Sequence, residues 1–290
     1  MDVRQRFYNF ISYLALTPDQ RLDGNTKQSG VRRCLNSHYY SVSDATSNSI
    51  LVGSWGKATE VRPPRDIDVL FALPKSVYDR YQTRPGNKQS QLLQEVKEVL
   101  TRTYPNTNMR GDGQVVMIPF TSYAVELVPA FLLTTGGYWI CDTNGGGRYK
   151  AFDPGAEIAL VDQSDRNAVG NTRHLIKMMK RWQGYCSVPL KSFAIELLAV
   201  HFVDNWHNRG KDYYWYDFMV RDFLAFLVAC AGKWIAVPGT GEQLLLGDAW
   251  KSRAETAYDR AVKACGYETT NALLAGLEWQ KIFGPDIPIS

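Results

Sequence analysis

Two aspartates separated by one residue are the first feature of this sequence that could do chemistry. Asp66 and Asp68 lie in the run Arg65–Phe71, whose apolar residues predict a β-strand. Side chains two apart on a strand point to the same side, so both carboxylates face one way while Ile67 and Val69 face the other. Two carboxylates on one side suit a hard divalent cation such as Mg²⁺. Such ions stabilise the attacking and leaving oxygens of phosphoryl transfer.

A glycine and a serine end the preceding apolar run. The segment Leu51–Ser54 indicates a strand that finishes on a tight turn. Gly53 would let the backbone approach a phosphate, and the hydroxyl and amide of Ser54 could donate hydrogen bonds to it. An ordinary turn can carry the same two residues. The Asp-x-Asp pair that follows favours a phosphate site.

In this order, the Gly-Ser turn and the Asp-x-Asp strand resemble the signature of the DNA polymerase β type nucleotidyltransferase superfamily. Three later segments resemble its branch of 2'-5' oligoadenylate synthetases and cyclic GMP-AMP synthases: Val125–Phe131, Lys180–Trp182 and Ser192–Leu198. The bacterial members of that branch, the CD-NTases, make cyclic oligonucleotides in CBASS anti-phage defence. The resemblance runs from Leu51 to Leu198, half of the chain.

The resemblance implies an α+β fold. A polymerase β-like nucleotidyltransferase lobe with a mixed β-sheet would precede an α-helical C-terminal lobe, with the active site in the cleft between them. We expect the first lobe, with its N-terminal spine helix, over residues 1–165 and the oligoadenylate synthetase-like helical lobe over residues 166–290. The length of 290 residues also favours two lobes.

Hydrophobic periodicity gives a coarse map of the elements. Helical spacing predicts helices over residues 3–16, 25–40, 89–101, 192–206, 213–231, 247–265 and 270–283, and another from residue 171. Residues 114–120 and 123–128 are each predicted to form a strand, and the two strands to form a hairpin. The glycine-rich segment 134–153 has neither a Walker lysine nor Rossmann spacing. We expect a flexible loop there, with substrate contact as the alternative.

The resemblance implies a third carboxylate at the metal site. Asp66, Asp68 and Glu126 would be the catalytic residues and would bind Mg²⁺ or Mn²⁺. Glu126 lies in an apolar strand, where an unpaired charge would be costly, so we expect it to have a partner. A metal ion would be such a partner, and a structural salt bridge is the alternative. The family usually has aspartate here, and glutamate reaches one methylene further.

The resemblance also implies five contacts with the nucleotide, from Gly53, Ser54, Lys180, Ser192 and Phe193. Gly53 and Ser54 would approach the β and γ phosphates, and Lys180 and Ser192 would contact the triphosphate. Phe193 would stack on the donor base, where the family often has tyrosine; a phenyl ring stacks but donates no hydrogen bond. Taken alone, Lys180 would be a solvated surface residue and Phe193 a core residue.

The resemblance predicts an enzyme that joins nucleoside triphosphates, ATP among them, into a cyclic di- or trinucleotide second messenger for anti-phage signalling. One alternative is nucleotide transfer onto RNA or a small-molecule acceptor, which a mild net charge of +4 does not favour for RNA. Another is a catalytically inactive nucleotide-binding module, against which the three carboxylates argue. Expected partners are CBASS regulatory proteins. A double-stranded DNA activator is not expected, because the zinc-binding insertion of the animal sensors has no counterpart here.

Composition places the chain in a reducing, aqueous compartment. Five cysteines stand singly, without Cys-x-x-Cys or zinc spacing, which indicates reduced thiols. No apolar run reaches the roughly 20 residues of a membrane span, and the N-terminus has no secretory pattern. We expect a soluble cytoplasmic protein that does not bind membranes.

Overall fold

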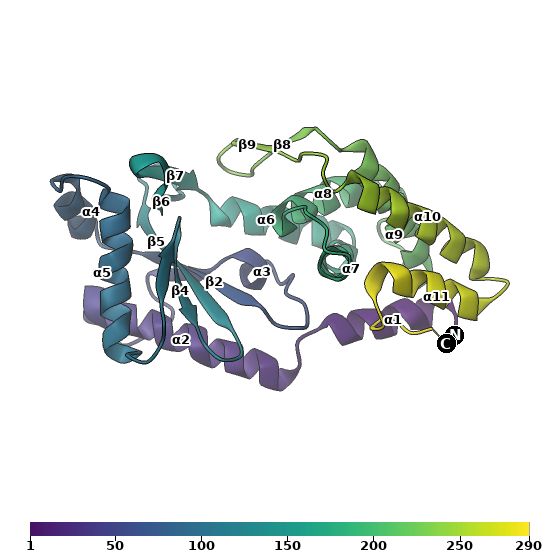
Figure 1. The fold of residues 1–290 in the computed structure, drawn as a ribbon, viewed down its shortest axis with the longest axis horizontal. Coiled ribbons are helices and arrows are strands. Elements are labelled where there is room, and N and C mark those ends of the chain that lie inside the picture. The colour runs from purple at the N-terminus through teal and green to yellow at the C-terminus, as the bar shows by residue number, and fades with distance from the viewer. Residues whose placement is uncertain (290) are drawn as a thin grey trace. The chain divides into compact units, whose positions relative to one another are not determined.

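The structure is a computed structural model that describes residues 1–289, except for the side chain of Asp112. The first half of the chain forms α1 (Val3–Leu14), α2 (Pro18–Tyr40), β1 (Ser49–Leu51), α3 (Gly53–Gly56), β2 (Asp66–Ala72), α4 (Lys75–Gln82), α5 (Lys88–Thr103), β3 (Arg110–Asp112), β4 (Val115–Pro119), β5 (Ala124–Leu132) and β6 (Tyr138–Asp142) (Figure 1). The second half forms η1 (Asn144–Gly146), β7 (Arg148–Phe152), α6 (Pro154–Asn167), α7 (Asn171–Tyr185), α8 (Ser192–Asn205), η2 (Tyr213–Trp215), α9 (Tyr216–Ala229), β8 (Trp234–Ala236), β9 (Gln243–Leu245), α10 (Lys251–Tyr267) and α11 (Ala272–Phe283). These residues fold into two compact units: an α/β unit of residues 17–58 and 64–158, and a helical unit of residues 1–16, 59–63 and 159–289.

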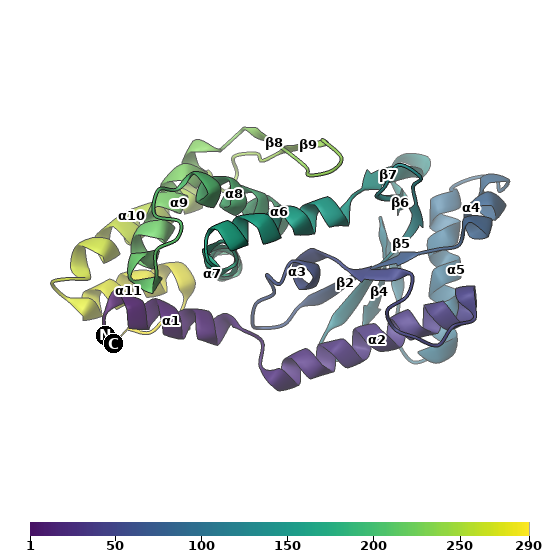
Figure 2. The same ribbon diagram turned by 180° about the vertical axis from the view of Figure 1, so that it is seen from behind.

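The α/β unit is built on one mixed sheet. Its strands run in the order β1-β2-β5-β4-β3. The C-terminal end of β5 also pairs with β6, and β6 pairs with β7. Strand β2 is parallel to β5, and the remaining pairs of this sheet are antiparallel. Helices α2 and α5 pack beside β2 and β4, as both ribbon views show (Figure 1, Figure 2). The core between them contains Val31 and Leu35 of α2, Ile67 and Val69 of β2, and Leu92 and Val96 of α5.

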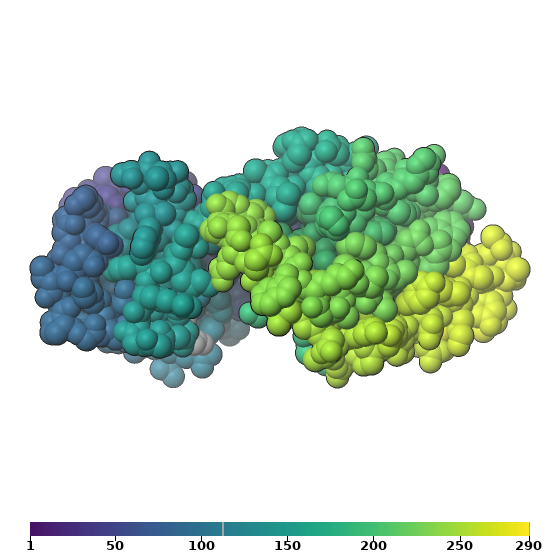
Figure 3. Space-filling view, turned by 90° about the horizontal axis from the view of Figure 1, so that it is seen from above, coloured from purple at the N-terminus to yellow at the C-terminus, as the bar shows by residue number. Residues whose placement is uncertain are grey.

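The helical unit has its own apolar core. Helices α7, α8, α9, α10 and α11 surround Trp182, Trp250 and Trp279, each at most 1% exposed. The two-stranded hairpin β8–β9 lies at the surface of this unit, where its yellow-green atoms are visible in the space-filling view (Figure 3). The predicted fold class, α+β with a mixed sheet and a helical C-terminal part, is confirmed.

The compact units divide the chain differently from the lobes expected at residues 1–165 and 166–290. Residues 1–16 and 159–165 belong to the helical unit. The reason for the first difference is packing, since Phe7, Phe10 and Leu14 of α1 are fully buried in the core of the helical unit. The second is also due to packing, since Val161 of α6 is 1% exposed in the same core. As a boundary between folding domains, residue 165 stays a prediction.

The expectation of a flexible loop over residues 134–153 was wrong for most of that segment. Strands β6 and β7 occupy it and extend the sheet through five paired positions. The glycines lie in the turns that flank β6, where Gly136 and Gly145 have positive φ angles of 90° and 61°. Such angles favour glycine, whereas the β-prone residues between the turns form the strand.

Residues 1–289 contain no helix with the length and apolar character needed to cross a bilayer.

Candidate active site

Strand register brings the three predicted carboxylates onto one face of the sheet. In the parallel pair β2–β5, Asp68 is directly opposite Glu126, and Asp66 is opposite Ala124. Directly paired residues of neighbouring strands, about 4.8 Å apart, point to the same face, and so do residues two apart on one strand. The burial pattern agrees, because Ile67 and Val125 are fully buried whereas the carboxylate positions between such residues remain partly or fully exposed.

The Gly-Ser turn lies directly against Asp68. The N–H of Val52 donates to the carbonyl of Asp68 at 3.0 Å, and α3 begins at the next residue. Gly53 has a φ of +55°, and a Cβ built on it would lie 1.8 Å from Oδ2 of Asp68. Glycine is therefore required twice, for its backbone angle and for the approach of the carboxylate. Ser54 follows in the first turn of α3 and is partly buried.

Neighbouring side chains fix the turn in place. Trp55 packs onto α2 so closely that a Cβ on Gly24 would lie 2.6 Å from its ring, and it makes an edge contact with Tyr123. Just after α3, the buried Nζ of Lys57 lies 3.3 Å from Oε2 of Glu157. The turn is thus held by packing on one side and by a buried ion pair on the other.

The chemistry of the donors fits a hard divalent ion. Three carboxylates on one face, beside Gly53, which has no Cβ, supply the oxygen ligands that Mg²⁺ prefers. Within residues 1–289, no three His, Cys, Asp or Glu side chains are drawn together closely enough to form a complete ligand set. The side chains of Asp66, Asp68 and Glu126 would therefore have to rotate toward one another to bind one ion. Like-charged carboxylates repel each other, and a bound cation would offset that repulsion.

Lys180 is buried rather than solvated. It lies on α7 in the helical unit, and its side chain is 9% exposed. Its Nζ donates to Oε1 of Glu196 at 2.5 Å, to Oγ1 of Thr59 at 2.9 Å and to the carbonyl of Thr59 at 3.2 Å. The hydroxyl of Thr59 in turn donates to Glu196 at 2.7 Å. The predicted contact of Lys180 with a triphosphate stays a prediction.

Ser192 and Phe193 occupy the first turn of α8. Both are partly exposed, whereas residues 194–200 behind them are buried. The hydroxyl of Ser192 donates to Oε1 of Gln183 on α7 at 2.7 Å. Phe193 is therefore only partly buried and not the core residue that it would be taken for alone. Since both residues belong to the helical unit, the expected cleft with the carboxylates stays a prediction.

Sequence reasoning missed the partners of Lys180. Glu196 is 3% exposed and Thr59 is fully buried. The signal for Glu196 was present, because a single carboxylate in the apolar run 194–200 needs a partner for the same reason as Glu126. Nothing in the sequence identified Thr59 as a partner of Lys180, since Thr59 lies 121 residues before it.

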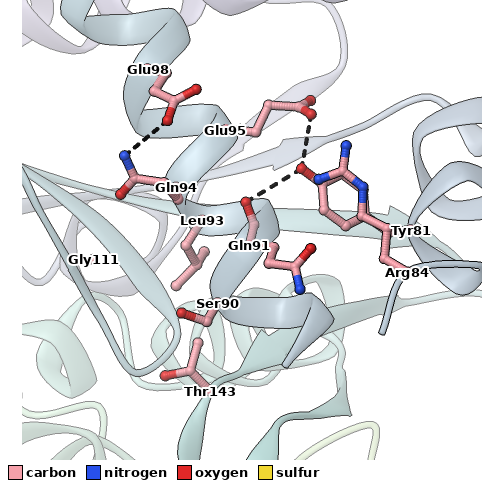
Figure 4. A pocket seen from close by; sticks show the side chains of 10 residues that line it. All are labelled: Tyr81, Arg84, Ser90, Gln91, Leu93, Gln94, Glu95, Glu98, Gly111 and Thr143. Atoms are coloured by element: carbon pink, nitrogen blue, oxygen red, sulfur yellow. Dashed lines mark hydrogen bonds between the residues drawn. The ribbon is translucent and has the colours of Figure 1, made fainter. Parts of the chain in front are cut away.

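A separate pocket of about 590 Å³ lies along α5, and none of the predicted site residues lines it. Figure 4 shows the Tyr81 hydroxyl between Glu95 and the backbone of Gln91. Burial alone would raise the pKa of Glu95, but hydrogen bonds from Arg80 and Tyr81 outweigh it and hold that pKa below its usual value. Burial and this carboxylate raise the pKa of Tyr81 to about 12. The polar side chains that line this pocket thus hydrogen-bond to one another, and the pocket lies away from the candidate site.

A mixed sheet with an Asp-x-Asp strand beside a Gly-Ser turn, joined to a helical unit, defines a nucleotidyltransferase of the polymerase β type. The chain belongs to the family of Second Messenger Oligonucleotide or Dinucleotide Synthetase domains, which matches residues 1–165. It is therefore an enzyme of second messenger synthesis, and the predicted membership of the CD-NTases is confirmed.

Two relatives in sequence support this assignment, and three solved structures have the same fold. A probable cyclic nucleotide synthase of Bacillus cereus is 20% identical, over 81% of this chain and 81% of that protein. The CBASS oligonucleotide cyclase CdnC of Escherichia coli is 26% identical, over 61% of this chain and 56% of that protein. The structure of E. coli CdnC with HORMA-deltaN aligns with a TM-score of 0.75 at 17% identity, and that of CdnC with ATP with 0.73 at 19%, over 99% of this chain and at least 98% of each. Vibrio cholerae DncV in its GTP-bound form aligns with a TM-score of 0.75 at 13% identity, over 99% of this chain and 96% of that chain. At these identities, the structures show the shared fold.

Proposed function

We propose that this protein joins nucleoside triphosphates, ATP among them, into a cyclic di- or trinucleotide that signals phage infection in a CBASS system. The observation that carries the proposal is the pairing of Asp68 with Glu126 on adjacent strands, with Gly53 in contact with Asp68. That arrangement places carboxylates beside a turn whose backbone can approach phosphate. The names of the Bacillus and E. coli relatives support the class of product.

The proposed chemistry assigns each residue one task. Asp66, Asp68 and Glu126 would hold Mg²⁺ or Mn²⁺, which when bound neutralises the triphosphate and makes the attacking hydroxyl more acidic. Gly53 leaves room for the phosphates, and Ser54 donates hydrogen bonds to them. In the helical unit, Lys180 and Ser192 would contact the triphosphate.

Base recognition would depend on Phe193. Its partly exposed ring can stack on the donor base without a hydrogen bond of its own. Stacking alone tolerates every base, because each has a π-face. We therefore expect Phe193 to contribute affinity, and other parts of the pocket to select the base.

Regulation would come from another protein. E. coli CdnC has been solved with HORMA-deltaN, which supports a CBASS regulatory protein as the partner of this chain. Double-stranded DNA is not expected to activate it.

The proposal is tested by incubating the protein with the four ribonucleoside triphosphates and Mg²⁺ or Mn²⁺, without any acceptor. Phosphatase treatment followed by mass spectrometry should reveal a product that resists phosphatase and has the mass of a cyclic di- or trinucleotide. Chelation of the divalent ion is the control and should abolish the product. Product that forms only after RNA or a small acceptor is added would instead favour transfer to that acceptor. Binding of triphosphates without any turnover would favour an inactive module.

A further inference from the structure

Helix α2 contacts each of the three segments that carry the predicted site residues of the α/β unit. In its N-terminal half, the buried Gly24 packs against Trp55 of α3 and Ile67 of β2. In the same half, the carbonyl of Gln20 accepts a hydrogen bond of 2.8 Å from the hydroxyl of Tyr123, which directly precedes β5. This part of α2 therefore borders the Gly-Ser turn, the Asp-x-Asp strand and the start of β5, all within one compact unit.

A glycine inside this helix calls for a reason. Alanine would stabilise the helix more, and the backbone of Gly24 has no positive φ that would require glycine. A Cβ built on Gly24 would lie 2.6 Å from Cη2 and 2.8 Å from Cζ2 of Trp55, and 3.1 Å from Cδ1 of Ile67. The close approach of the indole ring therefore explains glycine at this position.

The Trp55 ring has neighbours on other sides as well. It makes an edge contact with Tyr123, with ring centroids 6.0 Å apart, and the guanidinium of Arg21 lies 5.7 Å from its centroid. The fused ring is rigid, so it cannot bend away from a methyl group added at Gly24. Overpacking of this kind forces side chains off their rotamers and shifts the backbone.

Helix α2 is itself held against the start of β5. Lys27 donates hydrogen bonds to Asp23 and to Ser122, and the hydroxyl of Ser122 donates to Asp23. Together with the bond from Tyr123, these contacts fix the helix on both sides of Gly24. A clash at this point would therefore be relieved mainly by movement of the indole ring.

Movement of that ring would reach the Gly-Ser turn, because α3 has only four residues and Trp55 is the third. The backbone of α3 is closely packed at two further points. A Cβ on Gly56 would lie 2.3 Å from the carbonyl oxygen of Leu51, and one on Gly53 would lie 1.8 Å from Oδ2 of Asp68. A shift of α3 thus changes the distance between the turn and the Asp68 carboxylate.

We infer that Gly24 is a positioning residue: it lets the backbone of α2 lie against the Trp55 ring, and this contact holds α3, and with it the Gly-Ser turn, in place beside Asp68. Gly24 acts through Trp55. The catalytic consequence rests on the proposed function, whereas the seating of Trp55 on α2 does not.

The first test measures the turn independently of activity. In α3, the N–H of Gly56 donates to the carbonyl of Val52 at 2.9 Å. Hydrogen exchange of this amide, followed by NMR, should be faster in Gly24→Ala than in the wild-type protein. The matched control is Gly266→Ala in α10, where the added Cβ would have no atom within 4 Å and the exchange should stay unchanged. Unchanged exchange in Gly24→Ala would overturn the inference, whether or not the protein makes a nucleotide product.

The second test measures activity. Gly24→Ala should lower kcat/KM for nucleotide incorporation about tenfold, since a displacement of about 1 Å at a reacting centre can lower the rate about 100-fold and side-chain adjustment absorbs part of the clash. Gly266→Ala should keep the wild-type value. A wild-type kcat/KM in Gly24→Ala would contradict the positioning role.

A compensating variant separates positioning from a general structural role. The phenyl ring of Trp55→Phe is shorter than indole and ends before the two atoms that the new methyl group would overlap. Gly24→Ala/Trp55→Phe should therefore be about as active as Trp55→Phe alone, so that the two substitutions are strongly coupled. If Gly24→Ala lowered kcat/KM by the same factor in both backgrounds, the inference would be overturned. An inactive wild-type protein would refute the proposed function instead, and the exchange experiment would still decide whether Gly24 positions the turn.

Discussion

Replacing Gly53 by alanine should inactivate the enzyme without unfolding it. The added Cβ would lie 1.8 Å from Oδ2 and 2.6 Å from Cγ of Asp68, whereas real Cβ contacts essentially never fall below 3.0 Å. The carboxylate or the turn must therefore move by about 1 Å or more. A displacement of about 1 Å at a reacting centre can lower the rate about 100-fold. We expect a loss of that order in kcat.

The cost to stability should be much smaller. Alanine at a φ of +55° is strained by about 1–2 kcal/mol. Gly247→Ala is the matched control, because Gly247 has a φ of +64° and no atom within 4 Å of its added Cβ. Both variants should therefore lose about the same backbone stability, and they differ in the clash with Asp68.

The assay compares initial rates of nucleotide incorporation and the free energy of unfolding in denaturant for the wild-type protein and both variants. Gly247→Ala should keep wild-type turnover, and Gly53→Ala should lose it about 100-fold at a similar free energy of unfolding. Equal turnover in the two variants would refute the argument that the turn and Asp68 form one site.

Substitutions at three further residues test other parts of the structure. Glu126→Gln should lower kcat about 100-fold or more, on the scale of a lost electrostatic contact in the transition state, whereas Glu126→Asp should retain most of the rate; equal losses would contradict metal binding at this position. Burial raises the pKa of the Asp217 carboxyl to about 6, so the folded state holds more protons than the unfolded state between about pH 4 and pH 6, and the free energy of unfolding should fall as pH rises through that window. Asp217→Asn should thus be more stable than wild type by up to about 3 kcal/mol at pH 7 and by little at pH 4, and a gain independent of pH in denaturant unfolding would count against this reasoning. Arg6 is fully buried and bonds to Glu268 and to the carbonyls of Ala272, Pro288 and Ile289, so Arg6→Met should lose about 3–5 kcal/mol in urea unfolding; a loss below about 1 kcal/mol would show that this network contributes little.

The sequence was sufficient to predict the face on which Asp66 and Asp68 lie, because the period of a strand is two and the intervening residues are apolar. It was also sufficient for the hairpin β4–β5, since its two strands are close in the chain. The parallel pairing of β2 with β5, which places Glu126 opposite Asp68, joins strands separated by two helices and two strands. No local pattern specifies such a pair, and only the family resemblance linked these carboxylates.

Other features were not predicted from the sequence. For some of them a local signal was present but overlooked, and for others no local signal exists. Helix α2 begins at Pro18 and not near residue 25, and Thr17 and Gln20 form a capping box there that the sequence already displays. The strands β6 and β7 were hidden by the glycines of their turns. The buried hydrogen bonds of Lys180 join it to Glu196 and Thr59, which are 16 and 121 positions away in the chain, so tertiary packing alone brings these residues together.

The central claim is that the carboxylates on β2 hold the metal that makes nucleotidyl transfer possible. Its most direct test is the turnover of Asp66→Ala/Asp68→Ala with mixed triphosphates and Mg²⁺ or Mn²⁺, beside the wild-type protein and with the thermal unfolding of both recorded. The account predicts a phosphatase-resistant product from the wild type and none from the variant, with cooperative unfolding in both. A folded variant that turns over like the wild type would contradict it.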